Sequence, residues 1–149
     1  MKIDGGCHCG HVTYEAEIDP ETVEICHCTD CQTLSGSAFR TVVPARSDGF
    51  RLLSGQPKAY VKTAESGNKR LQAFCPDCGT PLYSAAAGDH PGTIGIRVGT
   101  IRQRDRLPPK AQYWWRSAQP WVTGLGAYVG NTVTMNVELT CCGAAGATW

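Results

Sequence analysis

Three cysteines within six positions form the most chemically informative segment of the chain, Cys26-His27-Cys28-Thr29-Asp30-Cys31. The spacing Cys-x-Cys-x-x-Cys can bring three thiolates around one metal ion. Structural zinc takes four protein ligands, whereas catalytic zinc takes three and keeps a position for water or substrate. No fourth ligand stands beside this cluster in the sequence. An open zinc site is therefore one hypothesis, and closure by a distant residue is the other.

Two cysteine pairs lie on either side of this trio. Cys7 and Cys9 follow two glycines, which permit the backbone dihedrals of a tight metal-binding turn, and Cys75 and Cys78 come much later. Two such pairs supply the four ligands of a closed tetrahedral zinc site, and the trio would then hold a second zinc ion. The spacing also permits another division, in which the trio shares ligands with one of the pairs.

The other candidate ligands have weaker patterns. Cys141 and Cys142 are adjacent, and because a disulfide between neighbours is strained, we expect two free thiols there. His8 and His27 sit between cysteines, where neighbouring residues often point away from a shared metal, and His11 and His90 lack any ligand spacing. We therefore expect cysteines alone to bind the metal.

Short strands must position these cysteines. Residues 11–18 alternate between apolar and polar side chains. Further strands are predicted at 38–43, 50–53, 59–62, 69–74, 82–86, 93–98 and 132–139, with Pro44 ending the first of these. After Cys28 we expect one helical turn, capped by Thr29 or Asp30 and ended by Ser35-Gly36. The pattern predicts a mainly β fold in a single zinc-binding domain, residues 1–149.

Composition excludes several classes of protein. The 149 residues carry a net charge of +1, which disfavours binding to nucleic acid or to an anionic membrane. Only Arg97–Arg106 is locally basic, and we interpret it as a solvated loop. No apolar run reaches the roughly 18 residues of a membrane span. The first six residues lack the apolar segment of a signal peptide, and nine clustered or unpaired cysteines favour a reducing cytoplasm.

Two further segments are candidates for binding a substrate. Ser35, Gly36 and Ser37 could donate hydrogen bonds to a reacting oxygen, or could simply turn the chain. Aromatic side chains gather at Tyr113-Trp114-Trp115 and at Trp121. Packing in the core is the preferred interpretation of these rings, and lining a pocket, with Trp114 as a substrate contact, is the alternative.

Four segments together resemble the glutathione-dependent formaldehyde-activating enzyme family, which also includes centromere protein V. They are Gly5–Gly10, Cys26–Cys31, Ser35–Phe39 and Phe74–Leu82, and the resemblance covers about residues 5–121. It implies a β-tent fold of antiparallel strands with two zinc ions per chain. It also implies ligand sets: Cys7, Cys9, Cys75 and Cys78 for the structural zinc, and Cys26, Cys28 and Cys31 for the catalytic zinc.

The resemblance further implies a carbon–sulfur lyase that joins glutathione to formaldehyde and gives S-hydroxymethylglutathione. Small-molecule partners would be such a thiol and a small aldehyde, and association into a homo-oligomer stays open. Gln112-Tyr113-Trp114 stands where members often carry His-Ile-Trp, Gly99–Arg102 ends in Ile-Arg rather than Leu-Asp, and 122–149 diverges as a strand and tail. These departures leave the substrate open. The alternative function is a non-enzymatic zinc-stapled module that binds a protein or a ligand.

Overall fold

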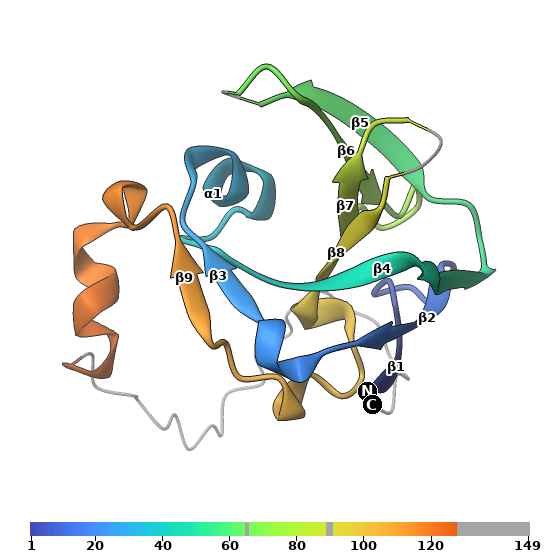
Figure 1. Ribbon diagram of the computed structural model, residues 1–149, viewed down its shortest axis with the longest axis horizontal. Coiled ribbons are helices and arrows are strands. Elements are labelled where there is room, and N and C mark those ends of the chain that lie inside the picture. The colour runs from blue at the N-terminus through green and yellow to red at the C-terminus, as the bar shows by residue number, and fades with distance from the viewer. Residues whose placement is uncertain (65, 89–90, 128–149) are drawn as a thin grey trace, which may run out of the picture.

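The computed structural model describes residues 1–64, 66–88 and 91–127, and nine strands in it form one sheet (Figure 1). The strands are β1 Lys2–Gly6, β2 Thr13–Ile18, β3 Glu24–Cys26, β4 Arg40–Ser54, β5 Lys58–Thr63, β6 Lys69–Phe74, β7 Pro81–Ala86, β8 Thr93–Arg97 and β9 Ala111–Tyr113. Their order is β1-β2-β4-β8-β7-β6-β5, and β3 joins β4 to β9. Every pairing is antiparallel apart from that of β3 with β9. The mainly β class predicted from the sequence is confirmed.

Strand β4 holds the two halves of the sheet together. It pairs with β3 through Arg40–Val42, with β2 from Ala45 onward, and with β8 along its other edge. The sequence predicted two separate strands here, with Pro44 as the break, and this was wrong. Pro44 lies where β4 passes from β3 to β2, so neither neighbour on that edge pairs with it, and a strand tolerates proline at such a place.

The two-residue period of the strands separates a core face from an open face. On β4, the buried Val43 and Ala45 belong to the core, while Val42 and Pro44, which alternate with them, face the other way, into a cavity. Among the described residues, the largest fully buried side chains are Val12, Tyr14, Val23, His27, Val43, Cys75, Leu82, Ile96 and Ile101. The candidate metal ligands therefore lie at or next to the ends of strands whose core face is held in place by packing.

One α-helix, α1 Thr29–Ser35, lies within the described residues, beside β3 and on the same side of β4 as the β5–β8 strands (Figure 1). Its N-cap is Cys28, whose sulfur accepts the Cys31 N–H at 3.3 Å, so the predicted caps Thr29 and Asp30 are wrong by one or two positions. Gly36, at φ 63°, ends the helix as predicted, and its N–H donates to the Gln32 carbonyl.

No helix among the described residues is long and apolar enough to cross a membrane. Five 3₁₀ helices complete the described chain. They are η1 Pro20–Thr22, η2 Val98–Thr100, η3 Arg104–Arg106, η4 Trp115–Ser117 and the longer η5 Pro120–Ala127. The predicted strand 132–139, the adjacent cysteines Cys141 and Cys142, and His90 lie outside the described residues. Strand β1 was missed, because two glycines in a five-residue segment give it a weak strand pattern.

The aromatic cluster does not join the core as expected. Tyr113, Trp114, Trp115 and Trp121 are each 44–51% exposed. Tyr113 ends β9, Trp114 is the N-cap of η4, and Trp115 and Trp121 lie in η4 and η5. These elements lie next to α1 rather than between the strands of the sheet (Figure 1). The preference for core packing was therefore wrong.

Tyr14 anchors the start of the sheet. Its ring is fully buried, and its hydroxyl lies 2.7 Å from Thr100 Oγ1. Gly5 faces it across the β1–β2 pair, and a Cβ there would meet the Thr100 carbonyl oxygen and come within 2.7 Å of the Tyr14 ring. Burial raises the pKa of Tyr14 to about 12, above its ordinary value of 10.0.

This raised pKa gives a prediction for stability at alkaline pH. Between about pH 10 and 12 the unfolded chain loses the Tyr14 proton while the folded chain keeps it, so the unfolded state binds fewer protons and stability falls as pH rises. Tyr14→Phe should cost on the order of 1 kcal/mol near pH 8 through the lost hydrogen bond. The deficit should shrink or reverse toward pH 12. Urea unfolding of both proteins checks this, and a deficit independent of pH would contradict it.

Candidate functional site

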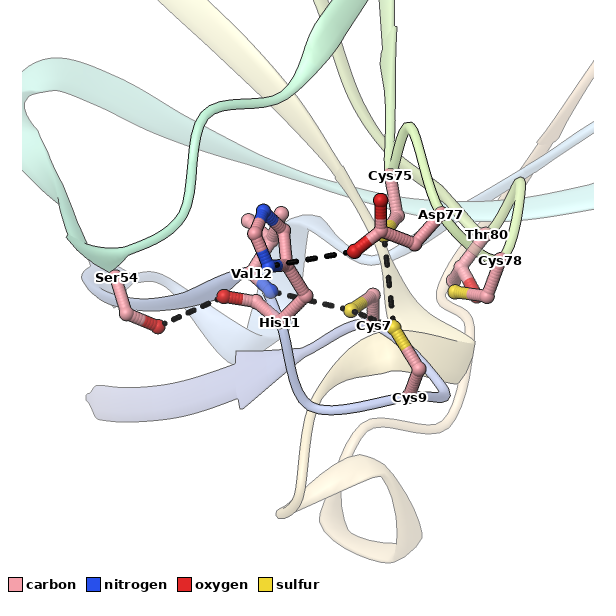
Figure 2. Close-up of polar contacts among 9 residues, drawn as sticks. All are labelled: Cys7, Cys9, His11, Val12, Ser54, Cys75, Asp77, Cys78 and Thr80. Atoms are coloured by element: carbon pink, nitrogen blue, oxygen red, sulfur yellow. Dashed lines mark hydrogen bonds and ion pairs between the residues drawn. The ribbon is translucent and has the colours of Figure 1, made fainter.

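Four sulfurs from two distant loops form one cluster. Cys7 and Cys9 lie just after β1, and Cys75 and Cys78 lie between β6 and β7. Their Sγ atoms all lie within 4.8 Å of one another, with 3.5 Å between Cys7 and Cys9 and 3.7 Å between Cys9 and Cys75 (Figure 2). Four sulfur donors at this separation fit a thiophilic metal ion. Any such ion would join strand connections about seventy residues apart in the chain.

Polar contacts hold the two loops of this cluster in place. The Val12 N–H donates to Cys7 Sγ at 3.2 Å, and Thr80 Oγ1 lies 3.1 Å from Cys78 Sγ (Figure 2). The His8 N–H crosses to the other loop and donates to Thr80 Oγ1 at 3.1 Å. His11 also crosses, through Nδ1 at 3.3 Å from Asp77 Oδ2 (Figure 2). Outer contacts of this kind orient metal ligands.

The trio forms a second, separate cluster. Cys26 ends β3, Cys28 caps α1 and Cys31 lies in its first turn, and the three sulfurs lie within 4.8 Å of one another. Within the described part of the chain, no fourth cysteine, histidine or carboxylate joins them. A hydrogen bond with Cys31 lowers the pKa of Cys26 to about 5 and raises that of Cys31. The cluster thus stabilises a thiolate, the form that binds metal.

A cavity of about 890 Å³ opens beside the trio. All three cysteines line one side of it, and the open face of β4, β6, β7 and β8 lines the other. An ion pair between Lys62 on β5 and Asp30 on α1 connects the two sides. The cavity is large enough for a small peptide-sized ligand next to the sulfurs.

The predicted substrate contacts fall in different places. Trp114 lines the cavity, in a left-handed conformation at φ 59°, with the Arg116 guanidinium 4.6 Å from the centre of its ring. Ser35, Gly36 and Ser37 are exposed and lie outside the cavity lining. The Ser35 hydroxyl donates to the Cys31 carbonyl at 2.6 Å, which fits the turn-forming interpretation. That these four residues contact a substrate stays a prediction.

Two buried arginines near the trio were missed by sequence reasoning. Arg40 and Arg97 are each 7% exposed, so the interpretation of Arg97 as part of a solvated loop was wrong. The exposed arginines of that segment are Arg102, Arg104 and Arg106. Arg97 ends β8, two residues after Gly95, on the face opposite the core residue Ile96. This alternation along the strand was the sequence signal that could have placed Arg97 on the sheet. Burial, and then the nearby Arg40, lower the pKa of Arg97 to about 10.

His27 and Gln32 fix the segments around the trio. The His27 ring is fully buried, with Nε2 2.8 Å from Gln112 Oε1 and the Trp115 ring packed edge-on at 5.1 Å. The Gln32 amide donates to the carbonyls of His27 at 2.7 Å and Ser117 at 2.8 Å. Helix α1 and the turn after β9 are therefore tied together. His27 lies between two candidate ligands but supports them through packing.

Two sulfur clusters on an antiparallel sheet define a small β protein with two candidate metal sites. The model of the glutathione-dependent formaldehyde-activating enzyme family matches residues 2–117, and the chain belongs to this family. A crystal structure of a Rhodobacter sphaeroides protein is similar, with a TM-score of 0.56 and 21% sequence identity. The match covers 73% of this chain and 98% of that one, and at this identity it shows the shared fold alone.

Removal of metal tests the role of the four-sulfur cluster. We expect complete chelation to unfold the protein, because a metal shared by loops far apart in sequence contributes on the order of 10 kcal/mol to folding. Circular dichroism and thermal melting before and after chelation, with metal content measured in parallel, check this. Unchanged spectra and melting after complete removal would contradict it.

Proposed function

We propose that this protein is a zinc-dependent carbon–sulfur lyase that joins a thiol such as glutathione to a small aldehyde such as formaldehyde. Membership of the family supports a role related to glutathione and formaldehyde. The observation that carries the proposal is the trio: three sulfurs within 4.8 Å, facing a cavity, with no fourth ligand among the described residues. This arrangement suits a metal site that exchanges a ligand.

Each cluster has its own role in the proposal. Zinc at the four-sulfur cluster is structural, with a closed ligand set. Zinc at the trio is catalytic and, when bound, offers a soft ligand position that favours the thiolate form of an incoming thiol. Both clusters bind zinc only while their cysteines are reduced, and this supports a reducing compartment such as the cytoplasm.

The reaction forms one bond between the two substrates. The sulfur of the thiol, after losing its proton, attacks the carbonyl carbon of the aldehyde. A carbon–sulfur bond forms, the carbonyl π electrons move to oxygen, and this oxygen takes up one proton, so the hydroxymethyl thioether contains every atom of both substrates. The cavity holds the two reactants together, which raises their effective concentration. Trp114 and Val42 contribute apolar surface to the cavity lining.

A non-enzymatic binding module is the second candidate function. The exposed rings of Tyr113, Trp115 and Trp121 favour it, because exposed aromatic side chains are common at protein interfaces. In that case zinc at both clusters would serve only the fold. The two functions differ in whether the trio is needed for turnover or for stability.

Cys28→Ser tests the catalytic assignment. Serine is a good N-cap, so α1 should keep its first hydrogen bond while the trio loses one sulfur. We expect the melting temperature to change little and the catalysed formation of S-hydroxymethylglutathione to disappear into the uncatalysed background. Exchange NMR with glutathione and ¹³C-formaldehyde measures the rate, and metal analysis should show one zinc instead of two.

Cys78→Ser is the matched control, with the same atom change in the other cluster. It should lower solubility or melting temperature, because its sulfur belongs to the set that joins the two loops. Equal effects of the two substitutions on stability and turnover would contradict the separate roles. Full activity of Cys28→Ser would contradict a catalytic role for the trio, and absence of turnover in the wild type would favour the binding module.

A further inference from the structure

The sheet side of the cavity is built from matching positions on four strands. Gln72 on β6 pairs with Ser84 on β7, Ser84 with Gly95 on β8, and Gly95 with Pro44 on β4. All four line the cavity. A Cβ at Gly95 would lie 3.1 Å from Val42 Cγ1 and 3.2 Å from the Ser84 hydroxyl, so glycine keeps this floor open. The floor therefore presents an amide and a hydroxyl to whatever occupies the cavity.

Arginines flank this polar row. Arg97 lies two residues from Gly95, and Arg70 lies two residues from Gln72, so both share the face that lines the cavity. Arg97 Nη2 donates to Gln72 Oε1 at 2.7 Å, while its Nε is buried and has no hydrogen-bond partner in the described structure. Arg40, behind it, likewise has a buried and unpartnered Nη2.

Negative charge is scarce on this side of the cavity. Among the described residues two carboxylates line the cavity: Asp30 pairs with Lys62, and Glu24 belongs to β3, on the side of the sulfurs. Within the described residues, Arg40, Arg70 and Arg97 form no ion pair with a carboxylate. The thiolates of the trio compensate part of the charge of Arg40 and Arg97, but buried N–H groups of both arginines still have no hydrogen-bond partner, and an anion that accepts from this group of arginines would complete the site.

We propose that Arg97 and Arg70, together with Gln72 and Ser84, bind a carboxylate of the thiol substrate, so that the enzyme selects thiols that carry a carboxylate. This inference rests on the proposed function and deepens it by naming the substrate class. The guanidinium fork suits a carboxylate in two-pronged geometry. The anion belongs to the thiol rather than the aldehyde, because a cavity of about 890 Å³ far exceeds what a one-carbon aldehyde fills.

Binding of S-methylglutathione tests the subsite without any turnover, because this thioether keeps both carboxylates but cannot become a thiolate. We expect calorimetry on the zinc-loaded protein to show binding that Arg70→Gln weakens about tenfold or more, as the loss of a charged hydrogen bond predicts. Esterification of the ligand should weaken its binding to the wild type in the same way. Arg51→Gln is the charge-matched control, since Arg51 pairs with Glu15 outside the cavity lining, and it should bind like the wild type.

Arg97 needs a milder change because it is buried. Arg97→Lys keeps the charge and should retain more binding than Arg97→Gln, with circular dichroism used to confirm that both fold. Equal binding by the wild type, Arg70→Gln and Arg97→Gln would overturn the subsite. So would a loss in Arg70→Gln that affects only anionic aldehydes such as glyoxylate and leaves the thiol ligand untouched. Charge-dependent binding in a protein without lyase turnover would support the subsite and refute the proposed reaction.

Discussion

The antiparallel register of the strands is the constraint on which both sites depend. Because side chains alternate along a strand, each strand that contributes Val43, Ile94 or Ile96 to the core must also present its intervening residues to the opposite face. A slip of one residue would place arginines in the core and isoleucines in the cavity. The packing of the core therefore fixes the polar floor of the cavity as well as the fold.

Charge complementarity relates the two sides of the cavity. Sulfurs that stabilise a thiolate lie on β3 and α1, and guanidinium groups lie on the facing strands. The thiolates of the trio favour the charged form of the buried Arg40 and Arg97, which burial opposes. Burial also raises the pKa of Glu24, beside Cys26. Arg70 and Arg97 thus line the cavity from the sheet and the trio lines it from β3 and α1, and a ligand with an anionic end and a sulfur end fits that arrangement.

Much of the site could be predicted because cysteine spacing is local information. The sulfurs group as four and three, which is one of the two divisions that the Cys-x-Cys and Cys-x-x-Cys spacing permitted and the one that the family resemblance implied. Gly36 ends α1 as expected, because only one type of residue enters the left-handed region at little cost. Pro44 misled the prediction, since its effect depends on which neighbour β4 has at that point, and this is a property of the whole sheet.

The buried arginines could not be placed from sequence because burial of a charge is decided by partners elsewhere. Arg97 and Arg102 look alike in the sequence, yet one lies under the cavity and the other is exposed. The aromatic segment was misjudged for a similar reason: Trp115 packs on His27 from outside, and Trp114 lines a cavity that exists only when β3, α1 and the sheet are assembled. Long-range contacts, rather than local periodicity, determine these positions.

The hydrogen bonds of Gln32 have a consequence for access to the sulfurs. The Gln32 side chain donates to the carbonyls of His27 and Ser117 and accepts a hydrogen bond from Gln119. These hydrogen bonds join α1, the cysteine segment before it and the turns after β9 into one wall of the cavity. The opposite wall meets this one through the ion pair of Lys62 with Asp30. Because the Asp30 side chain is exposed to solvent, added salt should screen this ion pair and loosen the contact between the two walls.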